Sequence, residues 1–149
     1  MTRPADDTDR SANPGTEQTR AETMRHIGEL ARALPAAQRS AHAYARRIDL
    51  FSGAEEVRRA HPSGRAYVVA TKLALIHSEV TEALLEIRSR QTDLDLPTRT
   101  ADDPLSSELA DIVLRTLELA EDLGIDLGAA IAAKAADTVV RYRHGGVRF

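Results

Sequence analysis

Two pairs of acidic residues stand at helical spacing in the second half of the sequence. Glu79 and Glu82 are three positions apart, and so are Glu108 and Asp111. Residues three apart project from one face of an α-helix, so each pair would present two carboxylates in the same direction. Four converging carboxylates repel one another and take up protons unless a cation neutralises them. Since hard divalent cations favour all-oxygen sites, the spacing indicates a site for Mg²⁺, with Mn²⁺ as an alternative.

The residues around these acids favour burial over a solvated charged face. Apart from Glu82, the helix neighbours of Glu79 at three and four positions are apolar: Leu75, Ile76 and Ala83. An unpaired carboxylate would be costly to bury in such a patch. A chain with 23 acidic residues also produces such pairs by accident, usually on solvated faces. Spacing alone therefore leaves a purely structural role open.

Other metal chemistries fit the sequence less well. Ferritin-like di-iron bundles need a Glu-x-x-His motif, and no histidine follows any of the four acids by three residues. His77 precedes Glu79 by two residues, on a different face of the expected helix. The sequence contains no cysteine, which excludes thiolate ligands and disulfides.

Helical periodicity dominates the chain and no alternating strand pattern is long enough for a sheet, which predicts an all-α fold. The best helix extends from about residue 66 to 90, with apolar residues at helical spacing and no internal Gly or Pro. A second helix is expected from Pro104 to about residue 122, with Asp103 as its N-cap and Gly124 just past its end. These two helices carry the two acid pairs.

The remaining segments complete a single all-α domain over residues 16–149. Residues 1–15 are polar and predict a disordered N-terminal tail. A helix is expected from residue 16 to 34, and Pro35 should end it or open the next, which runs to about residue 50. The other expected elements are a break at 51–53, a short helix before Gly64, a loop at 91–102 and a last helix from about 127 to 143.

Composition limits the partners. The 149 residues carry a net charge of −3 with both signs interspersed, so no basic field favours a nucleic-acid polymer. No apolar run approaches the roughly 18 residues of a membrane span, and the polar N-terminus has no signal-peptide core. Together with the absence of cysteine, this predicts a cytoplasmic protein without a membrane partner.

The residues around the acid pairs resemble a known family. KLALIHSEVTEALLEIR, from Lys72 to Arg88, is followed after a variable loop by ELADIVLR, from Glu108 to Arg115. Together with GIDLGAAIAAK at 124–134 and RYRHGG at 141–146, these words closely resemble the MazG-like all-α nucleoside triphosphate pyrophosphohydrolases. The resemblance covers about residues 66–149. It implies a helical bundle completed by oligomerisation, as a homodimer or homotetramer, which uses Mg²⁺ to convert an NTP or dNTP to the monophosphate and pyrophosphate.

The resemblance, together with the position and charge of nearby residues, predicts roles for individual residues. Glu79, Glu82, Glu108 and Asp111 would bind the metal, and Glu79 or Glu82 would orient or deprotonate the attacking water. Lys72, two turns before Glu79 on the same face, is a candidate for contact with substrate phosphate. The other candidates for substrate binding are Lys134, Asp137 and Arg141. Arg115 is expected to pair with Asp111 or another acid and so to support a metal ligand.

The sequence also departs from the family pattern. Ser78 stands where many members have the first of two consecutive Glu residues, and Asp137 and Val140 stand where many have Asn and Arg. These departures motivate one alternative, a catalytically weak nucleotide-binding regulator. A second alternative is a structural helical oligomer whose acids are solvated.

Overall fold

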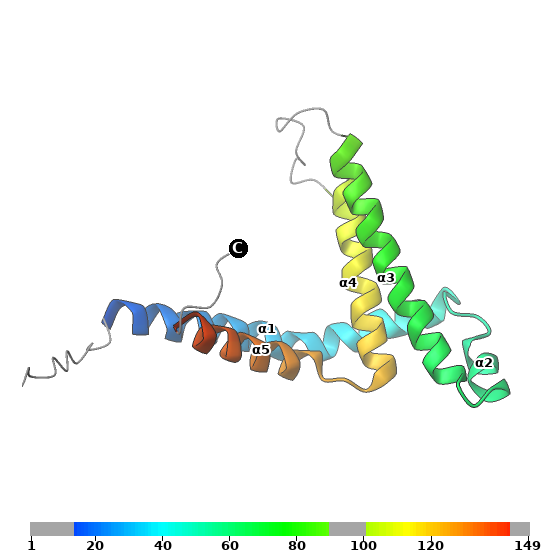
Figure 1. Cartoon of the computed structure of the whole chain (residues 1–149), viewed down its shortest axis with the longest axis horizontal. Coiled ribbons are helices and arrows are strands. Elements are labelled where there is room, and N and C mark those ends of the chain that lie inside the picture. Colours follow the sequence, from blue (N-terminus) through cyan, green and yellow to red (C-terminus); the bar gives the residue numbers. More distant parts are fainter. Residues whose placement is uncertain (1–13, 90–100, 144–149) are drawn as a thin grey trace, which may run out of the picture. The chain divides into compact units, whose positions relative to one another are not determined.

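The computed structural model describes residues 14–89 and 101–143, with side chains described for 18–89 and 101–138. The described chain forms five helices, α1 (Pro14–Arg47), α2 (Ala54–Ala60), α3 (Gly64–Ser89), α4 (Pro104–Leu123) and α5 (Leu127–Arg143) (Figure 1). Those ranges contain no strand, which confirms the all-α class. The predicted loop at 91–102 lies mostly outside the described residues, as does the predicted tail, apart from residues 14 and 15 at the start of α1.

The chain divides into two compact units. One combines Met1–Arg32 with Gly128–Phe149, and the other is Ala33–Leu127. The second unit therefore contains α2, α3, α4 and the C-terminal part of α1, and it carries both acid pairs. The prediction of a single domain over residues 16–149 stays a prediction.

The expected helix boundary at Pro35 is wrong, because α1 continues through this proline. A proline inside a helix removes one backbone hydrogen bond, here the bond to the carbonyl of Ala31 four residues earlier. Packing after Pro35 offsets this loss, since Ala41 and Ala45 are buried. Gln38 is buried too, and its side-chain amide donates to the carbonyl of Ile125 and accepts from the backbone N–H of Leu127.

Within the first unit, α5 approaches α1 closely at Gly128. A Cβ atom on this glycine would lie 2.2 Å from the carbonyl oxygen of Ala31. Because backbone cannot move aside as a side-chain tip can, this position requires glycine.

We therefore expect Gly128→Val to lower the free energy of unfolding by about 1–3 kcal/mol through steric overlap with α1. Ala130→Val adds a branched side chain at an exposed position of the same helix and serves as the control. Thermal unfolding followed by circular dichroism compares the two. Equal melting temperatures would contradict the close approach.

The helices α3 and α4 pack side by side and antiparallel (Figure 1). As predicted, Asp103 caps the start of α4, where its Oδ1 accepts from the backbone N–H of Leu105 at 2.9 Å, and Pro104 follows. The predicted C-terminal cap is confirmed as well, because Gly124 adopts a left-handed conformation with φ of 69°. Its N–H is directed at the last carbonyls of the helix. These caps fix the length of the helix that carries Glu108 and Asp111.

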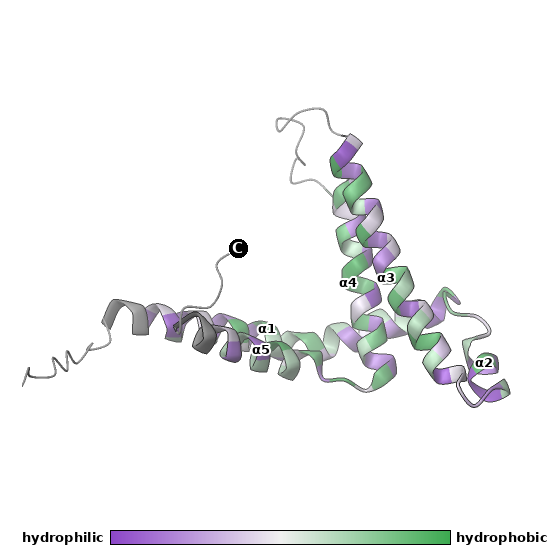
Figure 2. Ribbon diagram, viewed as in Figure 1, coloured by the Kyte–Doolittle hydropathy of each residue, from purple (hydrophilic) through white to green (hydrophobic). Residues whose placement is uncertain are grey.

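The core of the second unit is small and partly charged. Its buried apolar residues are mostly alanine, with Val68, Leu117 and Leu119. Lys72, Glu79 and Glu118 are buried as well, whereas large apolar side chains of α3 and α4 remain exposed. Figure 2 shows hydrophobic and hydrophilic residues alternating along both helices. No described helix combines the length and apolar character needed to cross a membrane.

Candidate metal centre

The structure brings three of the four predicted metal ligands together. Glu79 and Glu82 on α3 and Glu108 on α4 each offer a carboxylate oxygen, and these oxygens all lie within 4.8 Å of one another. The i, i+3 spacing places both α3 acids on one face, and the antiparallel packing of α4 brings Glu108 to that face. Glu79 is buried, Glu108 is half-buried and Glu82 is exposed, so the cluster opens to solvent on one side.

Asp111, the fourth predicted ligand, lies outside this group of oxygens but acts on it electrostatically. The pKa of Glu108 is raised above its ordinary value of 4.5, first by desolvation and then by the charge of Glu82. A hydrogen bond with Glu79 and the charges of Glu79 and Asp111 raise it further. The cluster thus carries the like-charge repulsion expected of carboxylates that share a site.

Two neighbours hold the α3 acids in place. Arg115 on α4 forms an ion pair with Glu79, with 2.6 Å between Nη2 and Oε1. Ser78 donates a hydrogen bond from Oγ to Glu82 Oε1 at 3.2 Å. Ser78 therefore orients a neighbouring acid. Arg115 binds Glu79, one of the acids that the sequence left open as its partner.

The residues present suit a hard divalent cation. Their donors are carboxylate oxygens, and among the described side chains only Arg115 forms an ion pair with an acid of the cluster. The raised pKa of Glu108 marks a repulsion that a divalent cation would relieve. Three carboxylates would leave coordination positions free for water and phosphate oxygens, as Mg²⁺ requires.

Lys72 has buried partners that the sequence analysis missed. Its side chain is only 4% exposed, and Nζ donates to Glu118 Oε1 at 2.7 Å and to Asp122 Oδ2 at 2.9 Å. The ammonium also lies 4.3 Å from the centroid of the Phe51 ring. Lys72 is therefore not a solvated lysine, and its predicted contact with phosphate stays a prediction.

A signal for these partners was present in the sequence. The polar residues of α4 recur at steps of three and four, the spacing of one helix face: Glu108, Asp111, Arg115, Glu118 and Asp122. This face continues the acid pair toward the C-terminus of α4, where it meets Lys72 near the start of α3. Extending the acid-pair pattern by three turns would have identified both partners.

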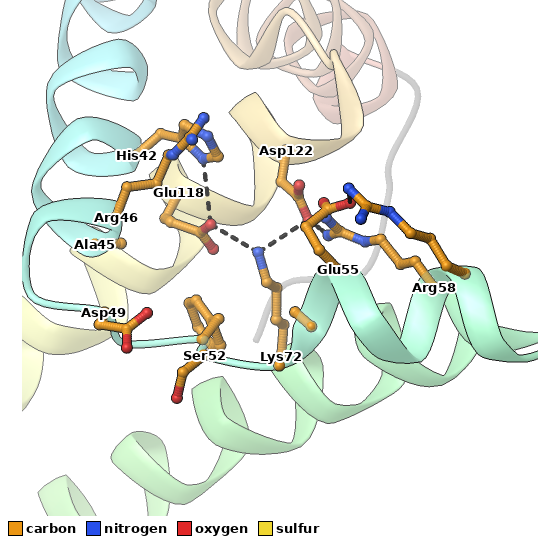
Figure 3. Close-up of a pocket in the computed structure, with 14 residues that line it drawn as sticks. His42, Ala45, Arg46, Asp49, Ser52, Glu55, Arg58, Lys72, Glu118 and Asp122 are labelled. Carbon is orange, nitrogen blue, oxygen red and sulfur yellow. Dashed lines mark hydrogen bonds and ion pairs between the residues drawn. The ribbon is translucent and has the colours of Figure 1, made fainter.

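A cavity of about 700 Å³ opens beside Lys72 (Figure 3). It lies within the second unit, between the end of α1, the segment that leads into α2, and the facing parts of α3 and α4. His42 and Phe51 contribute to its wall together with Lys72, Glu118 and Asp122. The cavity thus has a charged wall, in which Lys72 is paired with Glu118 and Asp122, and a rim of loop residues.

Asp122 lies at the junction of two cations. Burial opposes its ionisation, but the hydrogen bond and charge of Lys72 and the charge of Arg58 outweigh burial, so its pKa is lowered from 3.8. A group whose pKa falls on folding stabilises the folded state at pH values above its unfolded pKa. That stabilisation is complete above about pH 3.8 and is lost as the pH falls through the lower folded value.

At pH 7 we expect Asp122→Asn to lower the free energy of unfolding by about 1–3 kcal/mol, because Lys72 and Arg58 lose a charged acceptor. The difference from the wild type should shrink below pH 3.8, where the wild-type carboxyl takes up its proton. Urea unfolding across the pH range measures this, and Asp49→Asn, at an exposed position, is the control. A deficit that stays constant down to pH 2 would refute the ion-pair explanation.

The predicted C-terminal substrate residues belong to the other unit. Lys134 is exposed and Asp137 is half-buried, both on α5. Arg141 lies in the last turns of α5, but its side chain falls outside the described residues. Substrate binding by these three residues stays a prediction.

In comparisons with known proteins, no family model, no curated protein and no solved structure matches the chain.

Proposed function

We propose that the protein is a Mg²⁺-dependent nucleoside triphosphate pyrophosphohydrolase of the MazG-like type, which converts an NTP or dNTP to the monophosphate and pyrophosphate. One observation carries the proposal. Carboxylate oxygens of Glu79, Glu82 and Glu108, from two antiparallel helices, lie within 4.8 Å of one another. Carboxylates this close repel one another, so a purely structural helix pair gains no stability from them. A metal-dependent phosphoryl-transfer site needs such converging carboxylates to bind its cation. The resemblance of these helices to the MazG-like motifs supports the same function.

Glu79, Glu82 and Glu108 would hold the metal, with Asp111 beside them. Bound there, Mg²⁺ would neutralise triphosphate charge and favour deprotonation of a nearby water. Arg115 holds the Glu79 carboxylate in position through their ion pair. Glu82 is exposed and has one oxygen bonded to Ser78, so its other oxygen is available to orient the attacking water and accept its proton.

The reaction would proceed by attack of this water on the α-phosphorus. A new bond forms from the water oxygen to phosphorus, the bond from phosphorus to the α,β-bridging oxygen breaks, and pyrophosphate leaves with that oxygen. The water proton passes to Glu82. Positioning by fixed carboxylates, rather than covalent catalysis, would supply most of the rate enhancement.

A substrate panel tests the function directly. The full chain is incubated with ordinary and modified NTPs and dNTPs in the presence of Mg²⁺, and products are separated to distinguish pyrophosphate from inorganic phosphate. We expect monophosphate and pyrophosphate in equal amounts and no turnover in EDTA. Release of inorganic phosphate, or turnover unaffected by EDTA, would rule out the proposed reaction.

Ser78 supports a second candidate, a nucleotide-binding regulator with weak catalysis. Its hydroxyl cannot serve as the carboxylate that many MazG-like proteins carry at this position. A regulator would gain thermal stability from nucleotide and Mg²⁺, since ligands that bind only the folded state raise its stability. The panel separates the two candidates, because the regulator would be stabilised without measurable turnover.

We further propose that the chain assembles with copies of itself. Four apolar side chains on one stripe of α3 are exposed: Leu73, Val80, Leu84 and Ile87. Exposed apolar residues in a row favour association, and the MazG-like resemblance implies a homodimer or homotetramer.

We expect light scattering at micromolar concentration to give the mass of a dimer or tetramer. Leu84→Asp should shift the protein toward the monomer, because the side chain is 59% exposed and a buried carboxylate at an interface is costly. Glu86→Asp, which keeps the charge two positions away, should leave the mass unchanged. A monomeric wild-type protein would contradict the assembly.

A further inference from the structure

The cavity beside Lys72 contains a buried carboxylate with one unused oxygen. The Glu118 side chain lines the cavity and is 5% exposed. Its Oε1 accepts from Lys72 at 2.7 Å and lies 3.3 Å from Nδ1 of His42. Figure 3 marks both interactions with dashed lines. The Oε2 atom of Glu118 is buried and has no hydrogen-bond partner among the residues that the structure describes. A buried charged acceptor without a donor costs free energy, so this oxygen is suited to a donor supplied by a ligand.

Arg46 and Arg59 also line the cavity, but the cations closest to Glu118 are already neutralised by acids. Lys72 is already paired with Glu118 and Asp122, and Arg58 is paired with Asp122 and Glu55. A carboxylate in this wall repels phosphate and carbonyl oxygens and accepts from N–H groups. The part of the wall around Glu118 therefore favours an uncharged part of a ligand that carries N–H donors.

The cavity lies at one end of the α3 and α4 pair, offset from the carboxylate cluster. Lys72 precedes Glu79 by seven residues on α3, and Glu118 follows Asp111 by seven on α4. Seven residues correspond to about 10 Å along a helix axis. A nucleotide whose phosphates lie at the carboxylates would have to extend its sugar and base by a comparable length to reach the cavity.

We infer, on the basis of the proposed function, that this cavity receives the nucleobase and that Glu118 selects bases that carry an exocyclic amino group. The carboxylate would accept from that amine, as Glu accepts from the N4 amine of cytosine in nucleic-acid recognition. Phe51 supplies an aromatic wall for the base. A keto base would place an oxygen against the same carboxylate and be rejected.

Two matched pairs of substrates test the selection. Within each pair a keto group replaces an exocyclic amino group, and the adjacent ring nitrogen changes from an acceptor to an N–H donor. The first pair is dCTP and dUTP, and the second is dATP and dITP. We expect kcat/KM with Mg²⁺ to favour the amino member of each pair by about 10- to 100-fold, the range for a hydrogen bond to a charged group. Dissociation constants measured calorimetrically without Mg²⁺ should show the same order.

The Glu118→Gln variant should remove the preference. A glutamine amide offers both a donor and an acceptor, so amino and keto bases should be accepted within about threefold of each other. Glu56→Gln removes the same charge from an exposed position of α2 and should keep the wild-type ratio. If Glu118→Gln does not fold, Ser52→Trp narrows the exposed rim of the cavity and should weaken binding of all four nucleotides.

Failure of this inference and failure of the proposed function are distinguishable. Hydrolysis of all four nucleotides with equal kcat/KM would overturn the selection by Glu118 and leave the proposed function intact. If the protein bound amino-bearing nucleotides preferentially but hydrolysed none, the inference about Glu118 would stand and the proposed enzymatic function would be ruled out. Affinity unaffected by Ser52→Trp, or no binding of any nucleotide tighter than about 1 mM, would overturn the assignment of the cavity to the base.

Discussion

Glu82→Gln should lower pyrophosphate release by about 10²–10⁴-fold while the helical circular dichroism stays that of the wild type. Glu82 is the exposed member of the carboxylate cluster, so its replacement leaves the packing of α3 and α4 intact. The amide keeps the shape of the side chain but neither carries charge for a cation nor accepts a proton from water. Steady-state release of pyrophosphate from the best substrate of the panel measures the effect.

The same variant should be more stable than the wild type when no metal is present. Glu82 is the first charge that raises the pKa of Glu108, and its removal relieves that repulsion. Added Mg²⁺ should then raise the melting temperature of the wild type but have little effect on the variant. Glu86→Gln, one turn further along α3, should behave like the wild type in both assays. If Glu82→Gln turned over substrate at the wild-type rate, the proposed metal centre would be ruled out.

Lys72→Met is expected to cause the largest loss of stability, about 3–5 kcal/mol. Removal of the ammonium leaves the buried Glu118 carboxylate without its cation, while Asp122 keeps its ion pair with Arg58. Burial of an unpaired charge is strongly unfavourable. Methionine has a similar length, so little packing is lost. Against a typical stability of about 5–15 kcal/mol, such a loss brings a small protein close to unfolding at ordinary temperature.

A double variant separates the charge effect from packing. When Glu118→Gln is added to Lys72→Met, the unpaired carboxylate disappears and the double variant should be more stable than the sum of the two single changes. Lys134→Met, at an exposed position of α5, should change stability by no more than about 0.5 kcal/mol. Urea unfolding gives all four values. Purely additive effects would show that Lys72 contributes packing rather than charge.

The helices could be predicted because their signals are local. Apolar spacing located α3, and Asp103, Pro104 and Gly124 marked the ends of α4 through backbone rules that depend on a few neighbouring residues. Pro35 could not be judged in this way. Its local preference is to break a helix, but the burial of residues after it depends on segments distant in sequence.

The candidate site also has a part that the sequence could predict and a part that it could not. The i, i+3 spacing predicted which faces carry Glu79, Glu82 and Glu108, but it could not predict how far α4 extends along α3. That alignment decides that Arg115 meets Glu79 and that Lys72 meets Glu118. It also decides that Asp111 lies beside the oxygens of the cluster and not among them. Pairings between helices depend on long-range geometry, which a single sequence does not encode in its local pattern.

The charged contacts between α3 and α4 also determine the register of the two helices. If α4 slid by one turn along α3, Arg115 would leave Glu79, and Lys72 would lose one of its two acids. Apolar side chains in the same places would often bind as strongly or more strongly, but they tolerate sliding because one methyl group resembles another. Buried ion pairs penalise every wrong alignment, as single polar residues do in coiled coils. The charged contacts between α3 and α4 thus fix the alignment that keeps Glu108 opposite Glu79 and Glu82.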